Sequence, residues 1–243
     1  MGANESSPHH GQNRLSRSQE YLKPIVYGGN DGIVTTFAIV AGFAGASAEG
    51  AAGLGVLAIL VFGLANLMAD AVSMGLGEFL SGRSHHQLYE AEHGREQRRI
   101  EASGGNPEGI ATILQSRGLS AGDAREAAAI LARSPGLAAD LRMAYETNIA
   151  DPGGTSPAAN GLITFASFVA LGVLPLLPYF FLPATALSFR LSVGATFAAL
   201  VLLGLLRWSA TGERLIRSVG ETVLVGGVCA LVAYLVGALV VAL

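Results

Sequence analysis

Apolar and polar residues are grouped along this chain in long blocks. A helix needs about 20 apolar residues to cross the roughly 30 Å hydrocarbon layer of a bilayer. Five blocks are long and apolar enough, and we predict a membrane-spanning helix in each: residues 25–47, 53–80, 158–181, 185–206 and 219–242. The sequence therefore predicts an all-α membrane protein whose two termini lie on opposite sides of the bilayer.

The polar segment between the second and third spans is predicted to be a helical insert. It contains no proline from residue 84 to 102 and only one glycine, so the second span is expected to continue as one long helix to about Gly104. Glycine and proline then separate three shorter helices, expected at 107–117, 120–132 and 136–149. In the third span, Pro175 and Pro178 are expected to kink the helix.

These boundaries divide the chain into four parts. They are a polar tail at 1–23, two spans at 24–81, the insert at 82–152, and three spans at 153–243. Short segments rich in lysine and arginine stay in the cytoplasm, and every lysine and arginine except Arg190 lies in the tail, the insert or the loop after the fourth span. We therefore expect a cytoplasmic N-terminus and insert and an outward-facing C-terminus.

Composition agrees with a membrane protein and excludes several other classes. The chain is 51% apolar and 14% charged, contains 32 glycines and has a mean hydropathy of +0.48. A net charge of −3 without a basic, aromatic-rich stripe argues against a nucleic-acid partner. The single cysteine, Cys229, excludes an internal disulfide and a thiolate metal site. Because no arrangement of serine, histidine and aspartate suggests hydrolysis, we predict neither an enzyme nor a prosthetic group.

Polar residues recur every fourth position in the second span. We call Asn66, Asp70, Met74 and Glu78 the polar stripe, because this spacing places them on one helix face. Oxygen ligands suit magnesium or calcium, whereas a thioether beside them favours a softer divalent ion such as Fe(II). In the alternative interpretation, Met74 is a packing residue and Asp70 bonds a polar neighbour.

Asp31 is a further acidic residue inside an apolar span. A charged side chain at this depth costs several kcal/mol, so it normally faces a partner, a cavity or an ion. Asp31 and Met74 both lie roughly 10 Å from the cytoplasmic ends of their spans. Because the two helices are antiparallel neighbours, we expect these side chains to meet. Gly28 and Gly32, like Gly75 and Gly77, would let neighbouring helices approach closely.

Three segments resemble the vacuolar iron transporter family, in a bacterial version: YGGNDGIVTTFAIVAGFAGA, FGLANLMADAVSMGLGEFLSGRS and LPLLPYFF. The resemblance covers essentially the whole chain from Tyr21. It implies a homodimer in the lipid bilayer that moves Fe(II), and often Mn(II), out of the cytosol in exchange for protons. It also implies a metal path between the protomers, lined by Asp31 and Met74. Asn66 stands where some relatives carry glutamate.

The resemblance also implies that the insert collects metal through glutamates and methionine. Glu96, Met143 and Glu146 fit that pattern, and Glu92 shares a helix face with Glu96. Two positions depart from it, because Arg99 stands where a second glutamate is expected and Arg142 where a second methionine is expected.

Two other interpretations of the insert remain open. His86, Glu90 and His93 share a different helix face and could bind metal instead. Alternatively the helix is simply solvated, with Glu92 and Glu96 paired to Arg95 and Arg99. For the whole protein, the alternative to a transporter is a membrane-anchored metal buffer or sensor whose spans only hold a dimer together.

Overall fold

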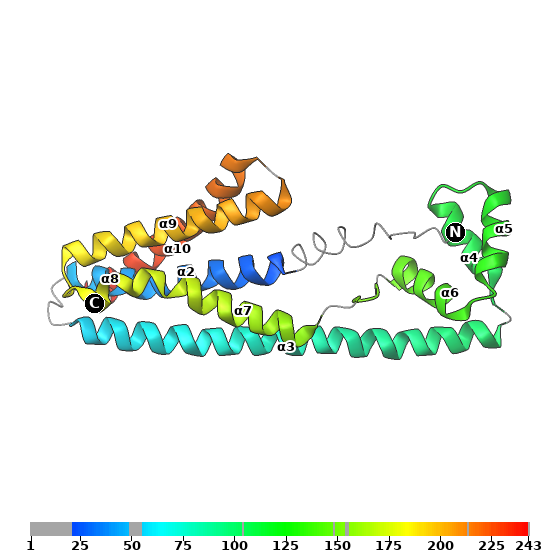
Figure 1. The fold of residues 1–243 in the computed structure, drawn as a ribbon, viewed down its shortest axis with the longest axis horizontal. Helices are drawn as coiled ribbons and strands as arrows, with labels where there is room; N and C mark the ends of the chain where they lie inside the picture. Colours follow the sequence, from blue (N-terminus) through cyan, green and yellow to red (C-terminus); the bar gives the residue numbers. More distant parts are fainter. Residues whose placement is uncertain are drawn as a thin grey trace, which may run out of the picture. The chain divides into compact units, whose positions relative to one another are not determined.

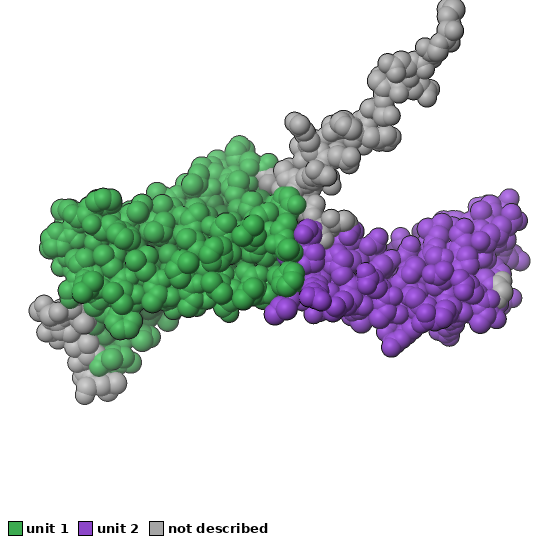
Figure 2. All heavy atoms as spheres, turned by 60° about the horizontal axis from the view of Figure 1, so that its bottom comes forward, with its two compact units in different colours: residues 1–79, 158–243 green, residues 80–157 purple. Residues whose placement is uncertain are grey.

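A computed structural model describes residues 21–48, 55–103, 105–147, 149–153, 156–212 and 214–242. The predicted tail at 1–23 lies outside this description except for its last three residues. All regular structure in the described residues is helical. The chain divides into two compact units: unit 1 comprises residues 1–79 and 158–243, and unit 2 comprises residues 80–157 (Figures 1 and 2).

Unit 1 is built from apolar helices, all of them long except the five-residue α8. They are α2 (Leu22–Ala48), the first part of α3 (Val56–Ala102), α7 (Pro157–Gly172), α8 (Leu177–Phe181), α9 (Ala186–Thr211) and α10 (Leu215–Ala242). Four segments are long and apolar enough to cross a membrane: Val56–Ala102, Pro157–Phe181, Ala186–Ser209 and Leu215–Val240. This supports a multi-pass membrane protein. The 27-residue helix α2 lies where the other span was expected but is not among these four, so the count of five stays a prediction.

The predicted kink in the third span is confirmed. Helix α7 ends at Gly172, a 3₁₀ turn follows at Leu174–Leu176, and α8 then begins at Leu177. Proline has no backbone N–H to donate, so helical hydrogen bonds are lost here and carbonyls need other partners. The buried hydroxyl of Ser192 on α9 donates to the Pro175 carbonyl at 2.6 Å, which satisfies one of them.

Close helix contacts hold α7 against its neighbours. A Cβ atom on Gly28 of α2 would lie 2.6 Å from the Thr164 carbonyl oxygen of α7. A Cβ on Gly75 of α3 would lie 2.9 Å from the Gly161 carbonyl oxygen of the same helix. One turn further along α7, Phe168 packs with Leu67 and Ala71 of α3 in a buried cluster. Glycine spacing thus fixes α2 and α3 around α7 and sets the position of the polar stripe.

Unit 2 contains the second part of α3, then α4 (Pro107–Ser116), α5 (Ala121–Leu131), α6 (Pro135–Arg142) and one π-helical turn (Met143–Thr147). As expected, α3 is one continuous helix, and the three shorter helices begin within a residue of their predicted starts. The third is shorter than expected, because its geometry changes at Met143. The core of the unit is mostly alanine, and its buried members are Ile100, Ile110, Ala111, Ala124, Ala128, Ala138 and Ala139.

Candidate metal sites

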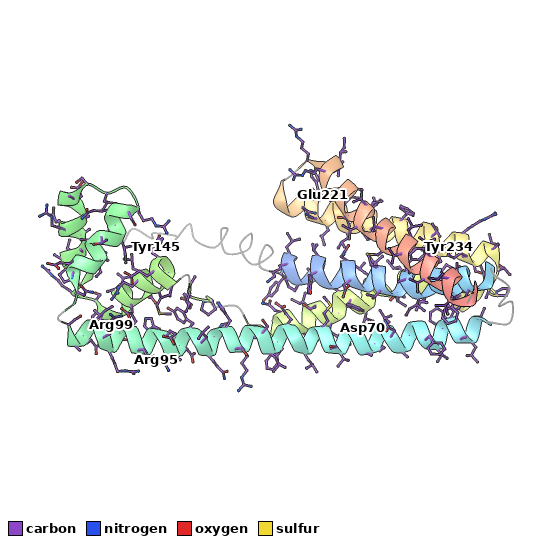
Figure 3. The ribbon with its side chains drawn as sticks, turned by 180° about the vertical axis from the view of Figure 1, so that it is seen from behind. Asp70, Arg95, Arg99, Tyr145, Glu221 and Tyr234 are labelled. Carbon is purple, nitrogen blue, oxygen red and sulfur yellow. The ribbon has the colours of Figure 1, made fainter. Side chains whose placement is uncertain are left out.

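The first two members of the polar stripe, Asn66 and Asp70, contact each other directly. The amide Nδ2 of Asn66 donates to Oδ2 of Asp70 at 2.6 Å, one helical turn further along α3. On the neighbouring helix α2, the Asp31 carboxylate lies close enough for its charge to interact with that of Asp70. All three side chains are half-buried in unit 1, where Figure 3 labels Asp70 on α3. The structure therefore gathers two carboxylates and an amide among apolar helices.

Met74 and Glu78 continue the polar stripe along α3, and both are half-buried. The Met74 side chain packs against the cluster of Leu67, Ala71 and Phe168. This contact fits the packing interpretation of Met74, while its place one turn from Asp70 also fits a role as a ligand. Asp70 is the charged group whose field acts on the Asp31 carboxylate, and the expected meeting of Asp31 with Met74 stays a prediction.

Asn66 also opens onto a groove. The groove has a volume of about 500 Å³ and lies among α2, α3 and α10. Its lining is otherwise apolar and comprises Ile39, Gly42, Phe43, Ala46, Phe62, Gly237 and Val240. The Asn66 amide is thus the strongly polar group in the lining of this groove, and through it the groove adjoins the polar stripe.

In unit 2, a buried arginine lies between two of the predicted metal ligands. We call Glu96, Arg142 and Glu146 the arginine cluster. The Arg142 Nη1 donates to Oε1 of Glu96, and its Nη2 donates to Oε2 of Glu146 at 2.8 Å. A third bond runs from Nε of Arg142 to the same Glu146 oxygen at 3.1 Å. The Arg142 side chain is only 11% exposed, so these charge-assisted bonds compensate its burial.

The other two predicted ligands of the insert line the same small cavity. Its volume is about 100 Å³, and its lining comprises Glu92, Glu96, Arg99, Arg142, Met143, Glu146, Thr147 and Ile149. Met143 is buried, whereas Glu92 pairs with the exposed Arg95 at 2.6 Å. Arg99 lies 3.7 Å from Glu96, so the predicted pairs along α3 are confirmed. Figure 3 labels Arg95 and Arg99 on this helix. The structure gathers all four residues, Glu92, Glu96, Met143 and Glu146, around arginine side chains.

The histidine-containing face of α3 is occupied by contacts within unit 2. The His93 Nε2 lies 3.1 Å from Oδ1 of Asp140 on α6 and 3.3 Å from the Gly136 carbonyl oxygen. Tyr89 donates its hydroxyl hydrogen to the same Asp140 oxygen, and its ring stacks on that of His93. His86 bonds the Gly82 carbonyl oxygen at 2.9 Å. The contacts of His93 and Tyr89 hold α6 against α3.

Neither unit presents a ready-made multi-ligand site in the residues that the structure describes. No group of three or more histidine, cysteine, aspartate or glutamate side chains is arranged to hold a metal ion there. The stripe and Asp31 offer carboxylates, an amide and a thioether spread along α3 and α2. Such an arrangement suits an ion that passes through with few protein ligands at a time, because partial coordination permits release.

The contacts of Arg142 are the feature that sequence reasoning missed. Its spacing of four residues from Glu146 is the usual spacing of helical ion pairs and could have indicated that bond. Its bond to Glu96 spans 46 positions of the chain and has no local sequence signal. The contact of Asp140 with Tyr89 and His93 was missed for the same reason, because it joins two helices that are distant in sequence.

Comparisons with known proteins extend across both units. The family model described as the VIT family matches residues 22–238. The chain is 32% identical over 229 residues to Vacuolar iron transporter 1 of Oryza sativa subsp. japonica, which covers 94% of this chain and 88% of that protein. It is also 32% identical over 243 residues to the Vacuolar iron transporter of Toxoplasma gondii, covering 95% and 78%. Vacuolar iron transporter 1 of Arabidopsis thaliana is 29% identical over 230 residues, covering 93% and 88%.

Proposed function

Because this chain belongs to the VIT family, we propose that it exports Fe(II) from the cytosol across a membrane, with Mn(II) as a second candidate cargo. Protons move in the opposite direction. The similar proteins named vacuolar iron transporters support a metal cargo, and the four apolar helices support a membrane setting. Fe(II) is the transported substrate here, and no prosthetic group is required.

The observation that carries the proposal is the group formed by Asp31, Asn66 and Asp70. A carboxylate among apolar helices costs several kcal/mol unless it faces a partner, a cavity or an ion. Asp31 and Asp70 interact with each other, so neither neutralises the other's charge. A divalent cation between them would neutralise both, and two protons would do the same. The pair is therefore suited to alternate between a metal-bound and a protonated state.

Proton exchange follows from competition at those oxygens. A proton and a metal ion bind the same lone pairs of a carboxylate, so acidification on the outer side favours metal release. The empty carboxylates then return in protonated form, which avoids carrying a bare negative charge through the apolar layer. Met74 adds a thioether to the path and favours Fe(II) over magnesium or calcium.

A homodimer would enclose the path, and the surface of α3 supports one. Each stripe residue directly follows a small exposed residue on α3, and these are Ala65, Ala69, Ser73 and Gly77. Small residues let a second helix approach closely in a membrane. With Val72 and Leu76 also exposed beside them, a second copy packed here would cover the half-buried stripe and exclude lipid from it.

In the proposed topology α2 also crosses the membrane, beside the four apolar segments. It is the first span along the chain and brings the number of spans to five. The N-terminus and the 82–152 insert then lie in the cytoplasm, the C-terminus lies outside, and the protein resides in the inner (cytoplasmic) membrane. The arginine-rich insert on the cytoplasmic side would gather metal through Glu92, Glu96, Met143 and Glu146 before it enters the stripe.

Reconstituted flux tests the proposal and separates it from a metal buffer. Purified protein in liposomes that contain a metal-quenched fluorophore is given Fe(II), with and without a pH gradient. We expect uptake well above that of empty liposomes, and acceleration when the metal-receiving side is acidic. If the protein binds Fe(II) but transports none, it is a metal buffer and not a transporter. If the rate of Fe(II) uptake is the same with and without the pH gradient, transport is not coupled to protons.

A further inference from the structure

Arg142 occupies the place that a metal ion would take among the four ligands proposed for unit 2. Its guanidinium bridges Glu96 and Glu146, which come from α3 and from the π-helical turn after α6. Side-chain exposures are 18% for Glu96 and 40% for Glu146, so the bridge is partly shielded from water. The protein thus supplies its own cation to these carboxylates.

The chemistry of the bridge resembles that of a bound metal in two respects. A guanidinium is permanently charged and donates in a planar fork to carboxylate oxygens, so it satisfies the same lone pairs that a divalent ion would use. It also balances charge: the three side chains of the arginine cluster carry a formal charge of −1 with Arg142 present. Without that arginine the charge would be −2, which attracts a divalent ion more strongly.

The surroundings of Arg142 provide what a metal ion would need once the guanidinium leaves. The buried thioether of Met143 and the hydroxyl of Thr147 line the adjoining cavity of about 100 Å³. That volume holds an ion with a few waters, since one water takes about 30 Å³. The helix changes to π geometry directly after Arg142, and such turns are frequent at functional sites.

We propose that Arg142 is a built-in competitor for divalent metal in unit 2, and that metal binds between Glu96 and Glu146 only by displacing its guanidinium. This inference rests on the proposed function for the identity of the metal. The consequence is a threshold: the insert stays closed by its own cation at low cytosolic metal and loads when the metal concentration is high. Arg142 thus sets the metal affinity of unit 2 without contacting the cargo.

The test replaces Arg142 with glutamine in the full-length protein, since glutamine keeps a polar side chain but removes the charge. Detergent-solubilised protein is titrated with Mn(II), and free Mn(II) is read by electron paramagnetic resonance. We expect Arg142→Gln to bind Mn(II) in unit 2 about tenfold more tightly, because a charge-assisted bridge no longer has to be broken. Arg99→Gln is the matched control, because Arg99 is 73% exposed and lies 3.7 Å from the same glutamate. Because its pair with Glu96 is exposed to water and therefore weak, this variant should change the affinity much less than Arg142→Gln does.

A triple variant assigns the gain to this cluster. Arg142→Gln combined with Glu96→Gln and Glu146→Gln should lose the added affinity, whereas sites on the polar stripe would be unaffected. If Arg142→Gln binds Mn(II) no more tightly than wild type, the bridge is only structural and the proposal is overturned. A gain in affinity that survives in the triple variant would overturn it as well, because the metal would then bind elsewhere.

A measurement on the unmodified protein decides the matter if Arg142→Gln does not fold. Phenylglyoxal modifies accessible arginines, and mass spectrometry identifies the modified position. Modification of Arg142 should rise severalfold at saturating Mn(II), while that of Arg99 stays constant; an unchanged Arg142 would overturn the proposal. Neither experiment measures Fe(II) flux, so a negative result in either would not contradict the proposed transport. Conversely, competition between Arg142 and metal can still be tested by these experiments if the protein transports no Fe(II).

Discussion

Asp31 and Asp70 pose a physical problem that only a proton or a cation solves, because two interacting carboxylates in an apolar setting repel each other. The Asn66 amide relieves part of this repulsion by donating to Asp70. At Asp31, the Thr35 hydroxyl donates to the backbone carbonyl oxygen at 2.8 Å and not to the side-chain carboxylate. The Asp31 carboxylate is therefore the better position at which to test the metal path.

We predict that Asp31→Asn reduces Fe(II) flux by about tenfold or more, which corresponds to roughly 1.4 kcal/mol of lost cation stabilisation. The amide keeps the size of the side chain and removes only its charge, so folding should change little. Flux in proteoliposomes, normalised to inserted protein, is the measurement. Ser209→Ala, at an exposed position of α9, is the control. Wild-type flux from inserted Asp31→Asn would remove Asp31 from the path.

Met74→Leu separates the two roles of the methionine. Leucine keeps volume and hydrophobicity, so its packing on Leu67, Ala71 and Phe168 should change stability by less than about 1.5 kcal/mol. If the thioether binds metal, Fe(II) flux falls severalfold and the preference over magnesium or calcium narrows. Competition assays with Mg(II) and Ca(II) measure this. Unchanged flux and selectivity would show that Met74 only packs.

For single residues, the sequence predicted contacts within one helix and missed contacts between residues that are distant in the chain. The polar stripe follows from a spacing of four, and the pairs of Arg95 and Arg99 follow from neighbouring glutamates on one helix. The approach of Asp70 to Asp31 and the bond of Arg142 to Glu96 depend on helix packing. No local pattern encodes such contacts, so Arg142 could be noted only as an unexpected residue at a ligand position.

At the scale of helices, the contact of α3 with α7 requires glycine at position 75 but not at position 77. A Cβ on Gly75 would lie 2.9 Å from both the Gly161 carbonyl oxygen and Cβ of Phe165, whereas a Cβ on Gly77 would have no neighbour within 4 Å. We predict that Gly75→Ala lowers the free energy of unfolding by about 1–3 kcal/mol, because the helices must separate.

Gly194→Ala on α9 is the control for that prediction, because a Cβ there would have no neighbour within 4 Å and the position lies outside the proposed dimer face. Alanine favours helix by up to about 1 kcal/mol over glycine, so this variant should be neutral or slightly more stable. Thermal unfolding of both variants in detergent makes the comparison. Equal midpoints for the two would contradict the close contact between α3 and α7.

Helix boundaries were predictable because hydrophobic block length and proline position determine them. The long apolar blocks gave α3, α9 and α10 to within a few residues, and the two prolines gave the break after α7. The π-helical turn at Met143–Thr147 was not predictable, since its residues are ordinary helix formers. Two of its residues make contacts outside the turn: Glu146 pairs with Arg142, and the Tyr145 ring lies 4.3 Å from the Arg117 guanidinium.

For the whole molecule, the number of spans decides where the termini lie. If α2 crosses the membrane beside the four apolar segments, the count is odd and the termini face opposite sides. We predict that a fluorescent protein fused to the N-terminus is bright in the cytoplasm. Alkaline phosphatase fused to the C-terminus should be active, because it needs the outer compartment. Two cytoplasmic termini would show that α2 does not cross.

The alanine-rich interior of unit 2 limits how its sequence can vary. Alanine is the smallest residue that still favours helix, so almost every substitution at a buried alanine adds volume that a packed interior does not hold. Ala124, Ala128, Ala138 and Ala139 are all fully buried. In a saturation mutagenesis scan these four positions would accept little beyond glycine and serine, while exposed neighbours such as Glu126 and Leu137 accept most residues. Evolutionary drift in this unit is then confined to its outer surface.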